Sequence, residues 1–215
     1  MSARPGGAAR AGAPPPGPPP ERLVRPSQVD GSYDGTLGRW VQSDGTIANA
    51  GFATSEPYIA ANELRGKKYP NVDLQLINDT GYPMYGQALT IRPEDKEKLT
   101  PCLEKLVPIL QQATVDFITN PDATNAVVIK AVETFKDFWQ YSPGMADYAV
   151  KTMRERGLIG NGPNKTLGDM QTERIKRMVD ILTPIFNAQK KPVKDGLRPE
   201  ELFTNEFINQ NIGLK

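Results

Sequence analysis

The sequence predicts an α/β fold in which a small, mostly parallel sheet precedes a long helical C-terminal half. Two short runs, 72–77 and 87–92, have the length and apolar content of strands, and the run 47–55 is typical of a short buried strand. From Pro93 onward, apolar residues recur at intervals of three and four, which is the helical period. Strands followed by long helices indicate a sheet that is covered by helices.

The first 22 residues form a separate segment. Of the first twenty, seven are Pro, four are Gly and five are Ala. Such a stretch cannot bury enough apolar surface to offset the entropy of ordering, so we expect residues 1–22 to be a disordered head. The head lacks the apolar core of a secretory signal, and no run in the chain reaches the length of a membrane span. We therefore expect no transmembrane segment, and a cytoplasmic protein if this start is the natural one.

Between the head and residue 66, turn signals alternate with short elements. Two Asp-Gly pairs mark turns, after which Asp34 or Thr36 can cap a short helix. Pro57 ends the run 47–55, because it lacks a ladder donor. The same proline suits the first turn of a second helix, which we expect over 58–66.

Alternation supports the strand at 72–77, whose first, third and fifth residues are apolar, and 87–92 is apolar at three of six positions. The segment between them contains Gly, Pro and two tyrosines, and is expected to be a loop. Tyr82 and Tyr85 can either wall a ligand site or fill the hydrophobic gap beneath this loop, and we favour the second.

Four helices are expected in the C-terminal half, at 93–120, 122–139, 145–156 and 169–188. Pro101 and Pro108 should kink or divide the first of them. Cys102 falls on its apolar stripe and is expected to be a buried small hydrophobe.

Composition excludes several function classes. Lys and Arg number 26 against 25 Asp and Glu, so the charge balance gives no reason to expect a nucleic-acid partner. The chain has no His, which excludes a Ser-His-Asp triad and any His-ligated metal. Its one cysteine excludes an internal disulfide and a thiolate zinc cage. We expect no cofactor and no metal.

Several runs together resemble a known family: QVDGSYDGTLGRW, GFATSEPYIAANEL, LINDTGYPMYGQALTIRPED, PCLEKLVPILQQATVDF and GDMQTERIKRMVDILTPIF. They are similar to the C-terminal portion of substrate-binding proteins of ABC importers, in the nitrate/sulfonate/taurine and thiamine-pyrimidine-precursor-like branch. The resemblance extends from about Val24 to Lys215. It implies an incomplete class II periplasmic-binding-protein fold, with 23–56 a remnant of the second lobe and 57–215 the C-terminal part of the first lobe.

The resemblance also implies a function. An N-terminally truncated substrate-binding component would bind a small polar solute and dock on an ABC permease, outside the cytoplasm in this family. The pyrimidine-synthesising relatives use a His and a Cys-rich motif that this chain lacks, so we do not expect an enzyme. The alternative is a non-binding remnant or an interaction module, which size-exclusion chromatography with dye binding would separate from a compact binding protein.

Thr54, Ser55 and Glu56 are the first candidate ligand-binding residues. They stand between a predicted strand and a predicted helix, where α/β sheets present their ligand crevice. If the resemblance carries over, Glu56 would accept a hydrogen bond from a ligand nitrogen between the lobes. Alternatively, the two hydroxyls are ordinary caps and Glu56 is a solvated carboxylate at a helix start.

Ser32, Tyr33 and Asp34 are the second candidate group. They lie in a turn bounded by glycines that runs into a predicted helix N-terminus, where backbone N–H groups can bind an anion or a carbonyl. Tyr33 could stack on a flat ring. Alternatively, this is a capped loop with a surface tyrosine, which is the interpretation we favour.

Overall fold

The computed structural model describes residues 26–32, 35–44, 46–136 and 140–215. Over these ranges the chain is helical, with no β-strand and no sheet. One isolated antiparallel bridge joins Asn161 and Leu167. The predicted α/β fold, with its small, mostly parallel sheet and its likeness to an incomplete class II periplasmic binding protein, is therefore wrong.

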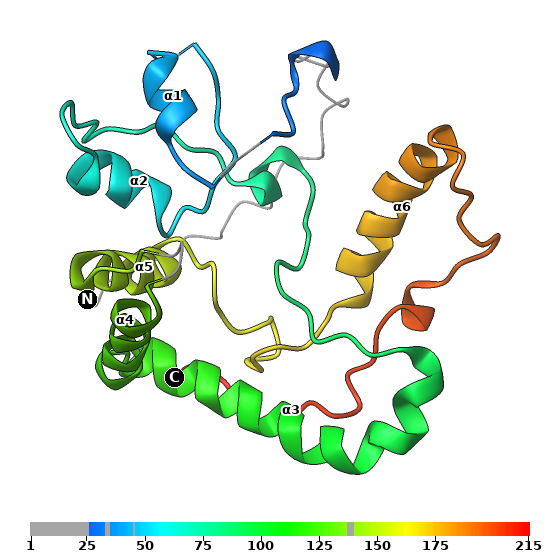
Figure 1. The fold of residues 1–215 in the computed structure, drawn as a ribbon. Helices are drawn as coiled ribbons and strands as arrows, with labels where there is room; N and C mark the ends of the chain where they lie inside the picture. Colours follow the sequence, from blue (N-terminus) through cyan, green and yellow to red (C-terminus); the bar gives the residue numbers. More distant parts are fainter. Residues whose placement is uncertain (1–25, 33–34, 45, 137–139) are drawn as a thin grey trace, which may run out of the picture.

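The helices have the following bounds: α1 Gly38–Gln42, α2 Glu56–Tyr58, α3 Lys96–Thr119, α4 Asp122–Phe135, α5 Pro143–Glu155 and α6 Thr172–Ala188. Short turns of other helix types are η1 Pro26–Gln28, η2 Ile59–Glu63, η3 Ile77–Thr80, η4 Pro93–Asp95 and η5 Pro199–Glu201, of which η2 is π-helical and continues α2. Figure 1 shows α3 along one edge of the molecule, α4 and α5 at one end of it, and α6 standing apart on the opposite side.

The runs predicted as strands lie outside the helices, except that Ile77 begins η3, and they remain unpaired. In 72–77, Val72, Leu74 and Leu76 are half-buried and the residues between them are exposed, so the predicted alternation is present. No backbone N–H of 71–76 or 86–91 donates a hydrogen bond to a described residue. A strand requires a neighbour that supplies ladder partners. No segment within the described ranges does so, and this is why the predicted sheet is absent.

The third predicted strand, 47–55, ends in a turn instead. The backbone N–H groups of Ser55 and Glu56 both donate to the carbonyl of Phe52, at 3.0 and 3.3 Å. Residues 53–55 thus curl directly into α2.

The predicted helical half is confirmed in α3 to α6. Pro101 and Pro108 lie inside α3 without dividing it, although each removes one backbone donor. At the start of α5, the Ser142 hydroxyl accepts a hydrogen bond from the Met145 N–H at 3.1 Å and caps the helix. Cys102 is exposed, so the prediction that it is buried is wrong.

The hydrophobic core is small. Ten apolar residues are buried among those described: Leu37, Ala60, Leu103, Ile118, Met145, Ala146, Ala149, Val150, Leu167 and Ile175. Most of them lie on α3 and α5. Fourteen large apolar side chains remain exposed, with Phe135 (77%), Val127 (68%) and Phe52 (62%) among the most open. The molecule therefore leaves much apolar surface in water.

The accessible surface leads to the same conclusion. The chain of 23.6 kDa exposes 16967 Å². Even fully extended, the undescribed residues would account for no more than about 5,000 Å² of this. The described part then exposes about 12,000 Å², whereas a compact protein of that mass exposes about 9,000 Å². The described residues form an open arrangement.

The C-terminal segment is fastened to α3 and to the loop before α6. Gln111 of α3 is buried, and its amide donates to the Leu167 carbonyl at 2.7 Å and accepts from the Asn209 N–H at 2.9 Å. Asn161 bonds the backbone of Leu214 in both directions, at 2.7 Å each. The last residues are thus held mainly by side-chain amides, together with the backbone bond from the Leu167 N–H to the Ile212 carbonyl.

Candidate functional site

The predicted junction Thr54–Glu56 forms the entrance to α2. The Glu56 carboxylate turns back on its own loop, where Oε2 accepts the Phe52 N–H at 2.7 Å and the Ser55 hydroxyl at 2.5 Å. This carboxylate packs so closely on Gly51 that a Cβ there would lie 2.8 Å from the Glu56 Cδ. Glu56 therefore stabilises the helix start, and Thr54 and Ser55 are half-buried beside it.

The second predicted group is a surface cluster. The hydroxyl and N–H of Ser32 donate to Asp30 Oδ1 at 2.6 and 2.8 Å, and Arg39 forms an ion pair with Asp30 at 2.5 Å. These bonds, above all those of the Arg39 guanidinium, hold the pKa of Asp30 below its ordinary value. Tyr33 and Asp34 lie outside the described residues. The bonds of Ser32 are confined to this loop and α1.

A groove of about 380 Å³ begins immediately after the junction. Its lining comes from α2 and η2, from the irregular segment after them, and from α5 with its C-cap: Pro57, Tyr58, Ala61, Asn62, Pro70, Asn71, Val72, Asp73, Leu74, Tyr148 and Arg156. The sequence predicted none of these as site residues. The π-helical turn η2 forms part of its wall, and such turns are frequent at functional sites.

Packing of α2 on α5 positions the groove. The rings of Tyr58 and Tyr148 lie 5.6 Å apart between centroids and are tilted by 41°. The Tyr58 hydroxyl lies directly over Gly144 near the start of α5. Ala60 is 1% exposed, and its carbonyl accepts the Tyr69 N–H at 3.0 Å, which fixes the return of the chain toward the segment 70–74.

The groove combines two aromatic rings with polar groups of both signs. The side chains of Asn71, Asp73 and Arg156 are exposed, and none of them hydrogen-bonds to another described residue. A carboxylate accepts, a guanidinium donates and an amide does both. This donor and acceptor set suits a small polar molecule that carries both an acidic and a basic group, with a tyrosine ring for apolar contact.

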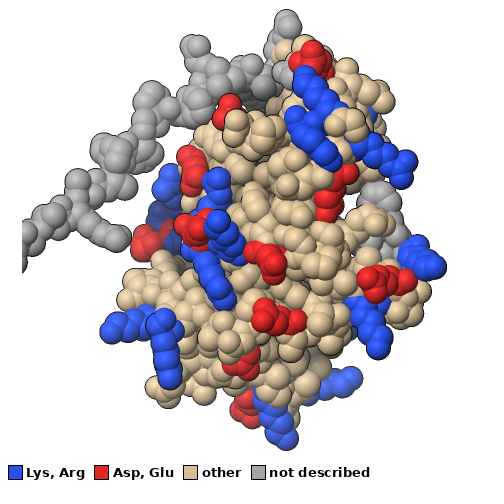
Figure 2. All heavy atoms as spheres, turned by 90° about the vertical axis from the view of Figure 1, so that its left-hand side faces the viewer, with Lys and Arg blue, Asp and Glu red and all other residues tan. Residues whose placement is uncertain are grey.

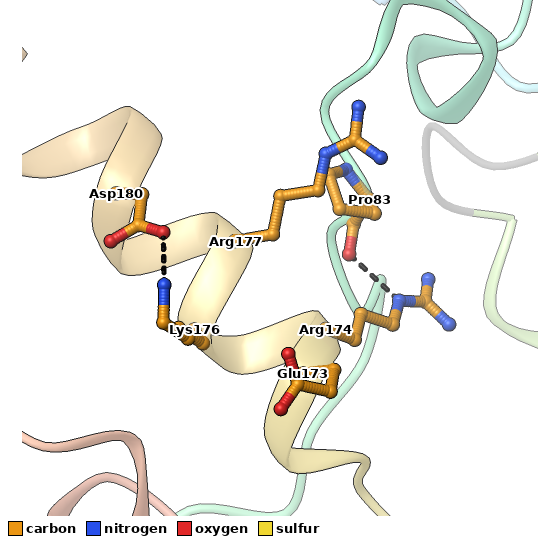
Figure 3. Close-up of a pocket in the computed structure, with 6 residues that line it drawn as sticks. All are labelled: Pro83, Glu173, Arg174, Lys176, Arg177 and Asp180. Carbon is orange, nitrogen blue, oxygen red and sulfur yellow. Dashed lines mark hydrogen bonds and ion pairs between the residues drawn. The ribbon is translucent and has the colours of Figure 1, made fainter. Parts of the chain in front are cut away.

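A larger concavity of about 440 Å³ lies on α6, beside the loop that holds Pro83. Arg174 is already engaged there, because its Nε donates to the Pro83 carbonyl at 2.7 Å and its guanidinium lies 4.0 Å from the Tyr85 ring centroid. Figure 3 shows Arg177 directed past Pro83, while Lys176 pairs with Asp180 on another side of the helix. The basic side chains do not point toward a common centre where an anion could bind. Arg174 instead holds the loop 83–85 against α6.

The side chains and helices of the described residues also bear on two other kinds of site, a metal site and a membrane-spanning helix. Basic and acidic side chains are intermixed on the face shown in Figure 2. Among the described residues, no three His, Cys, Asp or Glu side chains are grouped so that they could hold a metal ion. No described helix combines the length and apolarity needed to cross a membrane.

The groove residues could not have been located from the sequence. Tyr58, Asp73, Tyr148 and Arg156 are spread over about a hundred positions and share no motif. Pro57 was the only local pattern near the groove. It predicts a helix start, and so the position of α2, but it does not predict that α2 packs on α5.

Comparisons with known proteins identify no relative, since no protein-family model, curated protein or solved structure matches the chain.

We expect Gly144→Ala to disrupt the contact between α2 and α5. The added Cβ would overlap the Tyr58 hydroxyl oxygen and lie 2.9 Å from the ring carbon Cζ, so the ring must move. The free energy of unfolding, measured by urea denaturation, should fall by about 2 kcal/mol. Removing the hydroxyl in the double variant with Tyr58→Phe should recover part of this loss. Gly31→Ala, whose Cβ meets nothing within 4 Å, is the matched control, and an equal loss there would contradict the explanation.

Proposed function

We propose that this chain is a substrate-binding component of an ABC importer, and that it binds a small polar solute in the groove between α2 and α5. The observation that carries the proposal is that the predicted ligand junction, Thr54–Glu56, leads directly into this groove. The sequence resemblance set out above supplies the class of protein.

The proposed binding chemistry is non-covalent. Arg156 would donate to an acidic group of the solute, and Asp73 would accept from a basic one. Tyr58 and Tyr148 would cover the apolar part. Hydrogen bonds to charged groups are each worth about 1.5–3 kcal/mol, so two of them account for a useful share of a micromolar affinity, about 8 kcal/mol. Glu56 positions the start of α2 and does not contact the solute.

The resemblance also supplies the second partner. Substrate-binding components deliver solute to a membrane permease, and the same role is proposed for this chain. The solute could control docking if it binds one arrangement of α2, α5 and the segment 70–74 more tightly than another. A ligand shifts the equilibrium between two conformations only by the difference in its affinity for them.

Isothermal titration calorimetry of the whole chain tests the proposal. The panel is nitrate, taurine, an aminopyrimidine and a small amino acid. We expect binding of at least one panel member, weakened about tenfold by Arg156→Gln and by Asp73→Asn. Arg198→Gln, an exposed arginine that does not line the groove, should leave the affinity unchanged. A helical protein that gives no heat with any panel member, or a bound solute that is insensitive to both groove variants, would refute the proposal.

A further inference from the structure

The two unpaired runs 72–77 and 87–92 are complementary to one another. In both, the backbone N–H groups make no hydrogen bond to a described residue. Figure 1 shows the chain from 81 onward as an extended ribbon that runs from η3 toward the start of α3. Ile77 and Leu89 are exposed by 60% and 56%. The carbonyls at the ends of the runs are engaged locally, because Leu76 accepts the Asp79 N–H, Ile77 the Thr80 hydroxyl and Arg92 the Asp95 N–H. Along the rest of the runs, open backbone donors next to apolar side chains are what an added strand binds.

Side-chain chemistry selects one antiparallel register. If Asp73 lies opposite Arg92, the polar pair Gln75–Thr90 and the terminal apolar pair Ile77–Ala88 fall on the same face as that ion pair. The opposite face then carries two neighbouring apolar pairs, Leu74–Ile91 and Leu76–Leu89. A slip by one residue would place Asp73 against Ile91 and mix polar with apolar side chains. Pairing 72–77 with itself antiparallel would set Asp73 against Leu76.

Within one chain, the loop 78–86 between the two runs is held against α6. Arg174 of α6 donates to the carbonyls of Pro83 and Met84 at 2.7 and 2.6 Å. The Tyr85 hydroxyl accepts the Gln171 N–H at 2.8 Å. These contacts hold the middle of the loop on α6, and the two runs share no backbone hydrogen bond. Closing them into a hairpin would require the loop to leave α6.

We infer that two copies of this chain associate through two reciprocal antiparallel ladders, in which 72–77 of each copy pairs with 87–92 of the other. Each copy carries both complementary runs, so a two-fold arrangement uses all four. The existing contact of Arg92 with Asp95, 2.7 Å long and exposed, is a weak competitor, because surface ion pairs contribute little. Asp73 also lines the groove, so the ladder would engage this carboxylate with Arg92 of the other copy, whereas Arg92 and the rest of 87–92 lie outside the groove.

A charge-reversal cycle followed by sedimentation equilibrium tests the pairing. The wild-type chain should show a concentration-dependent dimer. Asp73→Arg alone and Arg92→Asp alone should each weaken dimerisation about tenfold, because each replaces an attractive pair by a repulsive one in both ladders. The double variant should restore the dissociation constant to within about threefold of wild type. Asp79→Arg, an exposed charge outside the paired register, should have no effect.

Each alternative result overturns the inference. A monomer at all concentrations excludes the dimer. A dimer with the same dissociation constant in all four proteins of the cycle, or one that the double variant fails to restore, excludes this register. Strand signal in the far-ultraviolet circular dichroism of a monomer would indicate a hairpin within one chain. The same spectra monitor helix content, so that a misfolded variant is recognised and replaced by the milder pair Asp73→Asn and Arg92→Gln.

Discussion

Replacing Gly213 by alanine should destabilise the protein by about 3 kcal/mol, because the new Cβ would overlap the backbone carbonyl oxygen of Lys165. It would also lie 3.0 Å from the Asn161 Oδ1, which accepts the N–H of the next residue, Leu214. A backbone oxygen cannot rotate away as a flexible side chain does. The C-terminal segment must therefore separate from the loop 161–167, and Leu167 would lose its bond to the Ile212 carbonyl, which is 3.0 Å long.

Urea denaturation with the helical circular dichroism signal measures this effect. Gly160→Ala is the matched control, because its Cβ meets nothing within 4 Å and the glycine lies in the same loop region. The control should change the free energy of unfolding by less than about 0.5 kcal/mol. Equal stability of Gly213→Ala and Gly160→Ala would mean that the C-terminal segment does not lie against Lys165.

Gln111→Met should cost a similar amount, about 3 kcal/mol, for a different reason. Methionine has nearly the shape of glutamine but no amide, so the packing in α3 is retained while the hydrogen bonds are lost. The Leu167 carbonyl would lose its partner, the Asn209 carbonyl would keep only the Ile212 N–H, and the Asn209 N–H would lose its acceptor. Buried polar groups that lose their partners cost more than the bond itself contributes. Gln111 is 5% exposed, so water cannot replace the lost bonds without opening the site.

The neighbouring residue provides the control for this variant. Gln112 is exposed and bonds only Asp116, at 2.7 Å, within the same helix. Gln112→Met should therefore change stability by less than about 0.5 kcal/mol. Hydrogen exchange adds a local measurement, because the Asn209 amide should exchange faster in Gln111→Met and at the wild-type rate in Gln112→Met. Unchanged exchange at Asn209 would contradict the role assigned to Gln111.

The small core explains why such polar contacts matter here. Few apolar residues are buried, so the net stability depends on contacts that in a larger core would be secondary. The exposed apolar side chains and the unpaired runs 72–77 and 87–92 have the same origin, since no described segment covers them. A partner that covers them would add to the stability of the fold by mass action.

The sequence predicted the helical half and several local features well. Apolar spacing located α3 to α6, and the alternation in 72–77 appears as alternating burial of Val72, Leu74 and Leu76. Pro57 lies in the first turn of α2, as its fixed φ and missing donor require. These features depend on residues within a few positions of one another, so a local pattern is sufficient to predict them.

Only the tertiary structure decided the rest. Whether an extended run becomes a strand depends on a neighbouring strand, which can be distant in sequence. The runs from which the sheet was predicted have no such neighbour among the described residues. Glu56 bonds its own turn, and Gln111 is a buried bridge to Leu167 and to Asn209, 56 and 98 positions away. The groove likewise exists because Tyr58 packs over Gly144. The spacing of apolar residues along the chain determines which face of a segment is apolar. Which other segment packs against that face depends on how the whole molecule is arranged.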